Sequence, residues 1–121
     1  MTLTKLDTGL QGPYPLSIDA INDEIVEGRP GAFALGYIDN LGRFCVTYVG
    51  SSQGDLKSKL KERIGTAQFF KFRHIATDRG AFEKECELFH DFRPAGNFMH
   101  PSRPKDSNWT CPRCRPVHSV R

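Results

Sequence analysis

Apolar positions in the central part of the chain show both of the periodicities that mark secondary structure. Two short apolar runs, 31–38 and 43–49, flank a tetrapeptide typical of a tight turn, Asp39-Asn40-Leu41-Gly42, and so predict a β-hairpin. Apolar residues then recur about every 3.6 positions through 56–64, which predicts a helix. A third strand is predicted over 69–76.

Two further helices bracket these central elements. A short helix is predicted over 18–27, capped by Ser17 and ended before Pro30. The residues before it read as a loose N-terminus. A last helix is predicted from Thr77 or Asp78 to about Phe92. The order of elements predicts an α/β (α+β) fold with a small three-stranded, mostly antiparallel sheet flanked by helices.

The chain has 121 residues, which is the usual size of one domain. We divide it into an N-terminal segment (1–29), a core (30–98) and an irregular C-terminal tail (99–121). Hydrophobic residues are 38% and charged residues 26% of the sequence, which excludes a disordered chain. The sequence has neither an apolar run of about 18 residues nor a signal-peptide pattern, so we expect a cytoplasmic protein without a membrane partner.

Positive charge gathers at the C-terminal end. The net charge is only +3, but residues 93–121 hold six basic residues and one acidic residue. The basic residues are Arg93, Arg103, Lys105, Arg113, Arg115 and Arg121. A basic end on a near-neutral body permits contact with nucleic acid, and a solvated basic tail fits the charge equally well.

One carboxylate lies on the apolar face of the last predicted helix. That face is formed by Ala81, Phe82, Leu88, Phe89 and Phe92. Glu85 falls in its middle, where a carboxylate is costly unless it is paired, protonated or bound to a metal. The sequence leaves two readings open. One is a structural salt bridge to Lys59, Arg63 or Arg73, and the other is a general acid or metal ligand.

The cysteine spacing predicts a zinc site rather than disulfides. Cys111 and Cys114 form a CxxC pair, while Cys86 and His90 lie one helical turn apart. These four residues make a plausible Cys₃His site that would fasten the tail to the last helix. His100 is a rival imidazole and His118 a weaker one. The alternative is two buried thiols beside a redox-inert turn. Cys45 has the setting of an ordinary buried cysteine.

An ordered set of residues resembles the GIY-YIG nuclease superfamily. The set begins with Pro30-Gly31-Ala32-Phe33 and Tyr48-Val49-Gly50 and continues with a basic helix and Glu85. It ends with Pro94 and Asn97, nine and twelve residues after the glutamate. The resemblance spans about residues 30–98, and the predicted order of elements matches the compact core of that superfamily.

The resemblance implies a role for individual residues. Tyr48 matches the tyrosine of the second motif, Glu85 the glutamate that binds a divalent metal, and Asn97 the asparagine that supports the site. Lys59 stands where the family has an arginine, and Arg63 where relatives often carry histidine. The resemblance thus implies a DNA endonuclease, a hydrolase that uses Mg²⁺ or Mn²⁺. RNA is not excluded as substrate, and the oligomeric state stays undefined.

The first motif departs from the family because its tyrosine is Phe33. A turn centred on Asn40-Leu41 would place Phe33 opposite Tyr48 in the hairpin. Tyr37 lies four residues further along the same strand and face and can replace the missing hydroxyl. Together with Lys59, Phe33 also supports an alternative function, a nucleic-acid-binding module that is catalytically weak or inactive. DNA contacts are expected from Lys59, Arg63 and the tail residues Arg103, Lys105, Arg113 and Arg115. Trp109 can stack on an unpaired base, but we expect it to pack onto the domain.

Overall fold

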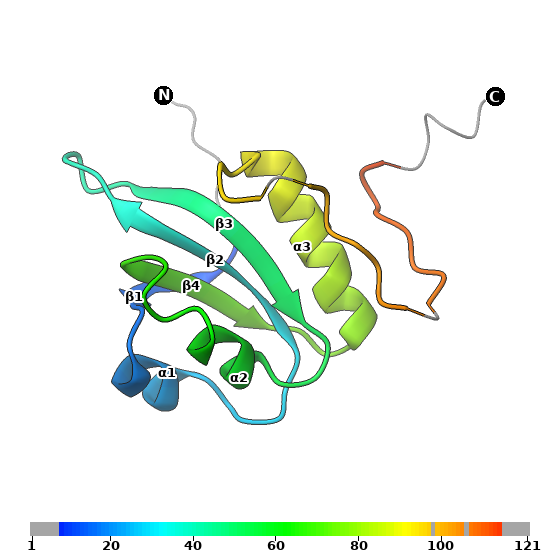
Figure 1. Ribbon diagram of the computed structural model, residues 1–121, viewed down its shortest axis with the longest axis horizontal. Coiled ribbons are helices and arrows are strands. Elements are labelled where there is room, and N and C mark those ends of the chain that lie inside the picture. The colour runs from blue at the N-terminus through cyan, green and yellow to red at the C-terminus, as the bar shows by residue number, and fades with distance from the viewer. Residues whose placement is uncertain (1–7, 98, 106, 115–121) are drawn as a thin grey trace.

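A computed structural model describes residues 8–97, 99–105 and 107–114. The fold is α+β, with one antiparallel four-stranded sheet in the order β1-β4-β2-β3 (Figure 1). The strands are β1 (Gln11–Pro15), β2 (Gly31–Ile38), β3 (Phe44–Ser52) and β4 (Phe69–His74). The helices are α1 (Ile18–Glu24), α2 (Leu56–Lys61) and α3 (Asp78–Phe92).

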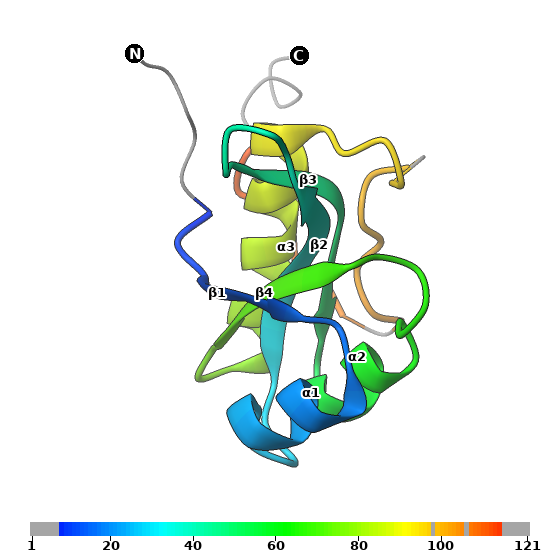
Figure 2. The same cartoon turned by 90° about the vertical axis from the view of Figure 1, so that its left-hand side faces the viewer.

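The helices cover the two faces of the sheet and make three layers. Helices α1 and α2 lie on one face, and α3 crosses the other (Figure 2). Ile21 of α1 and Leu56 and Leu60 of α2 are completely buried against phenylalanines of β2 and β4. On the second face, Leu88 and Phe89 of α3 pack on the small residues of β2 and on Val49 of β3. The tail continues from α3 and runs along the side of that helix (Figure 1).

The sheet has four strands rather than the three predicted. The additional strand, β1, pairs antiparallel with β4 at the edge of the sheet, so the N-terminal segment is part of the core. Its sequence, Gln-Gly-Pro-Tyr-Pro, lacks the usual features of a strand. Proline is tolerated there because an edge strand has one row of backbone groups outside the ladder. The pairing is also irregular between Gln11 and Tyr14.

The predicted hairpin forms, but its register differs from the prediction. Phe33 pairs with Gly50, and Tyr48 pairs with Leu35. The loop contains one residue more than expected, since Ile38 pairs with Phe44, and a bulge next to Gly36 adds another. Strand β3 is therefore displaced by two residues. Because the displacement is even, Phe33 and Tyr48 still project from one face, with their ring centroids 6.2 Å apart.

The helix starts agree with the sequence better than the helix ends do. Ser17 Oγ accepts from the Ala20 N–H over 3.2 Å, and Thr77 Oγ1 accepts from the Gly80 N–H over 2.9 Å, so both predicted N-caps are confirmed. Helix α1 ends at Glu24 and α2 at Lys61, each three residues early. Within the part of the chain that the structure describes, every helix is too short or too polar to traverse a bilayer.

Candidate active site and metal centre

Glu85 is bound by a serine of the neighbouring strand. Ser51 Oγ donates to Glu85 Oε1 over 2.6 Å, and Gln53 Nε2 donates to Ser51 Oγ over 3.0 Å. Ser51 lies in β3 and is only 8% exposed. The second strand of the predicted hairpin ended at residue 49, so the sequence did not reveal this partner. The signal available was the position of Ser51 directly after Tyr48-Val49-Gly50.

Burial dominates the electrostatics of Glu85. It raises the pKa of the carboxyl group above its ordinary value, while the Ser51 hydrogen bond, the positive charge of Lys59 and that of His100 when protonated act in the opposite direction. Lys59 of α2 is thus near enough for its charge to reach Glu85. Glu85 forms no salt bridge with any residue in 8–97, 99–105 or 107–114. The predicted salt bridge of this half-buried carboxylate to Lys59, Arg63 or Arg73 is therefore wrong.

Tyr48 is held by Arg63, which follows α2. Arg63 Nη2 donates to the Tyr48 hydroxyl oxygen over 2.8 Å, and the guanidinium lies 4.5 Å from the centre of the Tyr48 ring. The cation therefore both stacks on the ring and binds its oxygen, which orients the hydroxyl group. Since that oxygen accepts from Arg63, the hydroxyl proton is left to point elsewhere.

Asn97 closes the open edge of β3 beside Tyr48. Its Oδ1 accepts from the Val49 N–H over 2.8 Å, and its Nδ2 donates to the Val49 carbonyl over 3.0 Å. The Gly96 N–H donates to the Thr47 carbonyl over 2.7 Å. A Cβ at Gly96 would lie 2.5 Å from that carbonyl oxygen, so only glycine permits this approach. The segment before the tail thus pairs with β3 on both sides of Tyr48.

We expect Asn97→Ala to loosen this edge of the sheet. The substitution removes two hydrogen bonds to Val49, each worth about 0.5–1.5 kcal/mol, so the free energy of unfolding should fall by about 1–3 kcal/mol. Denaturant unfolding measures that loss, and hydrogen exchange at the Val49 amide should accelerate locally. Asn108→Ala, in the exposed part of the tail, is the control. An unchanged exchange rate at Val49 would show that the contact contributes nothing in solution.

Tyr48 and Glu85 approach the edge of β3 from opposite faces of the sheet. Tyr48 packs with the α1–α2 side of the core, whereas Ser51 faces α3 and its Glu85. Tyr48 and Ser51 are three residues apart, an odd number, so their side chains alternate across the strand over about 10 Å. A site of the kind implied by the resemblance should gather Tyr48, Lys59, Glu85 and Asn97 on one concave face of the sheet. That expectation is wrong, because the residues are arranged around an edge strand, with Lys59 acting on Glu85 from α2.

The two aromatic candidates of the first motif lie in very different places. Phe33 is 0% exposed, and a Cβ at Gly50 would lie 2.5 Å from its ring. The phenylalanine therefore fills the space above Gly50 and reaches no solvent. Tyr37 is 48% exposed near the hairpin loop, opposite Cys45. Proximity to Cys45, with smaller contributions from burial and Asp39, raises the Tyr37 pKa. Cys45 is half-buried rather than buried.

Four side chains of α3 and the tail form a cluster suited to a metal ion. The ligand atoms of His90, His100, Cys111 and Cys114 all lie within 4.8 Å of one another. Cys114 Sγ is 3.1 Å from His90 Nε2 and 3.5 Å from His100 Nε2. A tetrahedral zinc ion, with bonds of about 2.0–2.3 Å, spaces its N and S ligands by about 3.3–3.8 Å. The cluster could therefore hold a metal ion, and its donor types and spacing are consistent with zinc.

Three of the four residues of the cluster favour the protonation state that metal binding needs. The Nδ1 atom of His100 lies 2.8 Å from the Pro101 carbonyl oxygen, to which it can only donate, so Nε2 keeps its lone pair. Burial lowers the pKa of His90 and favours its neutral form. Burial opposes ionisation of Cys111, but hydrogen bonds from the Arg113 N–H and from His100 outweigh it and lower the Cys111 pKa. A neutral imidazole and a Cys111 thiolate are the forms that zinc binds, whereas burial and the neighbouring Cys111 raise the pKa of Cys114.

Cys86 lies next to this cluster but is not one of its four residues. The sequence grouped Cys86 with His90, Cys111 and Cys114, but the structure places the rival His100 in the fourth position. Cys86 is completely buried and packs with Phe82 and Cys111. Burial, with Cys111 close by, raises the pKa of its thiol strongly. Because helical spacing fixes only which residues share a side of α3, it could not distinguish these two ligand sets.

The tail packs along α3 through apolar and ionic contacts. Trp109 lies 6.0 Å from Phe82 between ring centroids, so it packs onto the domain as expected. Arg113 Nη1 lies 2.6 Å from Asp91 Oδ1. Arg113, one of the residues predicted to contact DNA, is therefore part of an ion pair. Arg103 and Lys105 are exposed, and Arg115 and His118 fall outside the described residues.

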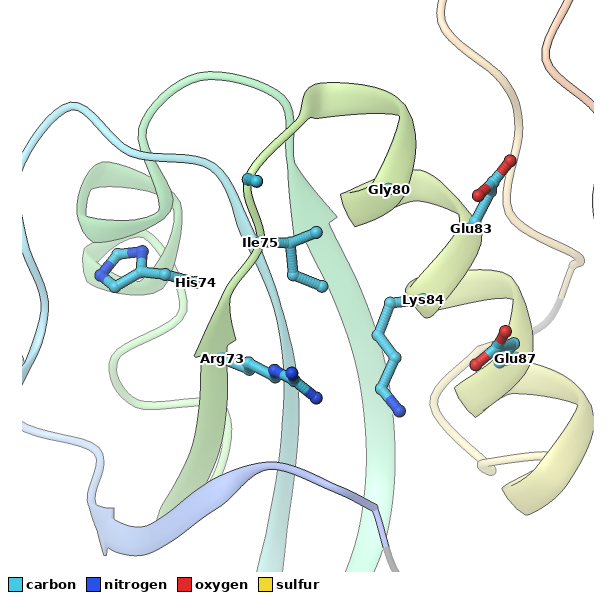
Figure 3. Close-up of a pocket in the computed structure, with 8 residues that line it drawn as sticks. Arg73, His74, Ile75, Gly80, Glu83, Lys84 and Glu87 are labelled. Carbon is cyan, nitrogen blue, oxygen red and sulfur yellow. The ribbon is translucent and has the colours of Figure 1, made fainter.

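A cavity of about 310 Å³ lies on a different flank of α3 (Figure 3). Figure 3 shows Arg73 of β4 and Lys84 of α3 extending into it, with Glu83 and Glu87 along the helix. Neither Tyr48 nor Glu85 lines it, and neither does any residue of the metal cluster. Its lining carries charges of both signs, so it has no evident selectivity for an anion.

Comparison with known proteins assigns neither a family nor a function to the chain. No family model, no curated protein and no solved structure matches the chain.

Proposed function

We propose that the protein is a metal-dependent endonuclease of GIY-YIG type that hydrolyses DNA phosphodiester bonds in the cytoplasm. The observation that carries the proposal is the set of groups around the edge of β3. Glu85 is a half-buried carboxylate that has a serine partner and no salt bridge among the described residues. Tyr48 bound to Arg63, and Asn97 on the adjacent Val49, complete the set implied by the resemblance.

Each residue of the site would have a separate role in hydrolysis. Glu85 would hold Mg²⁺ or Mn²⁺, and such an ion, when bound, supplies Lewis-acid polarisation of a phosphoryl oxygen. Tyr48, oriented by Arg63, would orient the attacking water or, in its deprotonated phenolate form, accept a proton from it. Lys59 and Arg63 would stabilise the negative charge that develops on the phosphoryl oxygens. Lysine contributes a point charge there without the bidentate geometry of arginine.

We further propose that the His90, His100, Cys111 and Cys114 cluster binds structural zinc. A small core benefits from such a fastening, because the tail has no regular secondary structure in its described part. Zinc bound there would connect the tail to α3, the helix that carries Glu85. It would also hold His100, three residues beyond the Asn97 contact with β3.

A second candidate function is nucleic-acid binding without efficient cleavage. The burial of Phe33 favours it, because the first-motif position can supply neither a hydroxyl group nor access to water. The two functions differ in one measurement. Nicked, branched and supercoiled DNA, and matched RNA, should be incubated with the protein with and without Mn²⁺. Cleavage that needs Mn²⁺ supports the nuclease, whereas retarded but intact DNA supports the binding module.

We expect Tyr48→Phe to reduce cleavage far more than Tyr37→Phe. Loss of a transition-state contact should lower the single-turnover rate by about 10²–10³-fold. Tyr48 lies beside the Asn97 contact, whereas Tyr37 is near the hairpin loop with Cys45 and Asp39. Both substitutions remove one hydroxyl group, so each serves as the control for the other. If Tyr37→Phe were the slower variant, the tyrosine assignment would be incorrect.

A further inference from the structure

The Ser51 hydroxyl is held in one orientation by its two polar neighbours. Gln53 Nε2 can only donate, so it occupies a lone pair of Ser51 Oγ. The hydroxyl proton is then directed to Glu85 Oε1, 2.6 Å away. That distance is typical of a charge-assisted hydrogen bond from a hydroxyl group to a carboxylate, about 2.5–2.7 Å. The chain from Gln53 through Ser51 to an ionised Glu85 therefore runs in one direction.

Ser51 is also fixed by its place in the sheet. It belongs to β3, pairs with Ala32 of β2 and is almost completely buried. A hydroxyl group on a paired strand is positioned more precisely than one on a loop. Glu85, by contrast, reaches the site at the end of a long side chain from α3. Ser51 thus provides a rigid reference point for a side chain with several rotatable bonds.

The hydrogen bond leaves one oxygen of Glu85 available. Oε1 accepts from Ser51, while no residue in 8–97, 99–105 or 107–114 donates to Oε2. A carboxylate with one oxygen fixed and the other open can present the open oxygen to a cation. Groups that orient a metal ligand through such a bond commonly change metal affinity by about 10–100-fold when they are removed.

We propose that Ser51 is a positioning residue for the divalent cation of this site, acting through Glu85. The inference rests on the proposed function, because it assigns the cation to Glu85. Ser51 itself would touch neither the cation nor the scissile phosphate. Gln53 supports Ser51 by donating to its hydroxyl oxygen, so the two residues form a short hydrogen-bonded chain that ends at Glu85.

The test compares Ser51→Ala and Ser51→Thr with Ser52→Ala in the zinc-loaded protein. Ser52 is the matched control, because its Oγ accepts from the Asp55 N–H and does not contact Glu85. Binding of Mn²⁺ without DNA is measured from the signal of free Mn²⁺ in electron paramagnetic resonance. We expect Ser51→Ala to weaken binding by about 10–100-fold. Ser51→Thr keeps a hydroxyl group and should remain close to wild type, as should Ser52→Ala.

Cleavage supplies a second readout. Ser51→Ala should raise the Mn²⁺ concentration at half-maximal rate more than it lowers the rate at saturating Mn²⁺, which a general loss of stability would not do. Unchanged Mn²⁺ affinity in Ser51→Ala, or equal weakening in Ser52→Ala, would overturn the inference.

The outcomes also separate this inference from the proposed function. If wild type binds Mn²⁺ through Glu85 but cuts no nucleic acid, the nuclease function is rejected. The Mn²⁺ affinity of Ser51→Ala, compared with that of wild type, then still supports or overturns the role of Ser51. Mn²⁺-dependent cleavage that is lost in Glu85→Gln but unaffected in Ser51→Ala would keep the nuclease and reject the inference. Wild type with no Mn²⁺ binding at Glu85 would reject both.

Discussion

Glu85→Gln is expected to lower Mn²⁺-dependent cleavage by at least about 10²–10³-fold while leaving the fold intact. The substitution removes the negative charge that a divalent cation needs, but its amide oxygen can still accept from Ser51. Glu85 is half-buried, and its carboxyl group accepts a hydrogen bond from Ser51 but forms no salt bridge with any described residue. Single-turnover cleavage of one plasmid measures the effect.

The same substitution should leave thermal stability unchanged or increase it. The pKa of Glu85 is raised in the folded state, so the carboxyl group favours folding below its ordinary pKa and loses that contribution as pH rises through the raised value. At neutral pH the ionised form therefore costs stability, and a neutral amide avoids the cost. A structural role would give the opposite result, a lower melting temperature with unchanged cleavage.

Glu87→Gln is the matched control for this prediction. Glu87 lies two residues further along α3 and lines the cavity on a different flank, and it undergoes the same chemical change. It should cut at the rate of wild type. If Glu85→Gln also cut at that rate, the activity would come from another site or from a contaminant.

The elements that the sequence predicts well are those whose local signals agree with their tertiary contacts. Strand β2 has the predicted bounds, and Thr77 and Ser17 cap their helices through the expected hydrogen bonds. Strand β1 was missed because it is stabilised by pairing with β4 rather than by its own composition, which includes two prolines. Local preference cannot reveal a partner that lies 56 residues away in the chain, as Phe70 does from Tyr14.

The candidate site likewise contains residues that the sequence indicates and residues that it does not. Glu85 could be named as a candidate because a carboxylate on an apolar helical face is conspicuous in the sequence. Ser51 was missed because a serine after a strand resembles the start of a loop. Whether Cys86 or His100 joins the cluster depends on the path that the chain takes along α3 after Asn97. Helical spacing carries no information about that path.

The isolated protein is expected to contain about one zinc ion per chain, bound by His90, His100, Cys111 and Cys114. Elemental analysis of protein never exposed to a chelator measures it. Cys111→Ser and His100→Ala should each lose most of the metal, because each removes one of four ligands. Cys86→Ser should retain it, since Cys86 packs behind the cluster with Phe82. Retention by His100→Ala and loss by Cys86→Ser would instead favour the ligand set predicted from sequence.

Removal of the metal should release the tail from α3. A ligand at about 1,000 times its dissociation constant stabilises the folded state by about 4 kcal/mol, so the chelator-treated protein should melt at a clearly lower temperature. Trp109 reports the local change, because it packs on Phe82 next to Cys86 and Cys111. Its fluorescence should shift to longer wavelength as the ring enters water. Zinc added back should reverse both effects.

Cys45→Ser is the control for this set, because Cys45 lies in β3 near the hairpin loop, opposite Tyr37 and outside the cluster. It should keep the zinc content, the melting temperature after chelation and the Trp109 emission of wild type. Since Asn97 and His100 are three residues apart, release of the tail should also speed hydrogen exchange at the Val49 amide. A chelated protein with unchanged Trp109 emission and Val49 exchange would show that the tail is held by its apolar and ionic contacts alone.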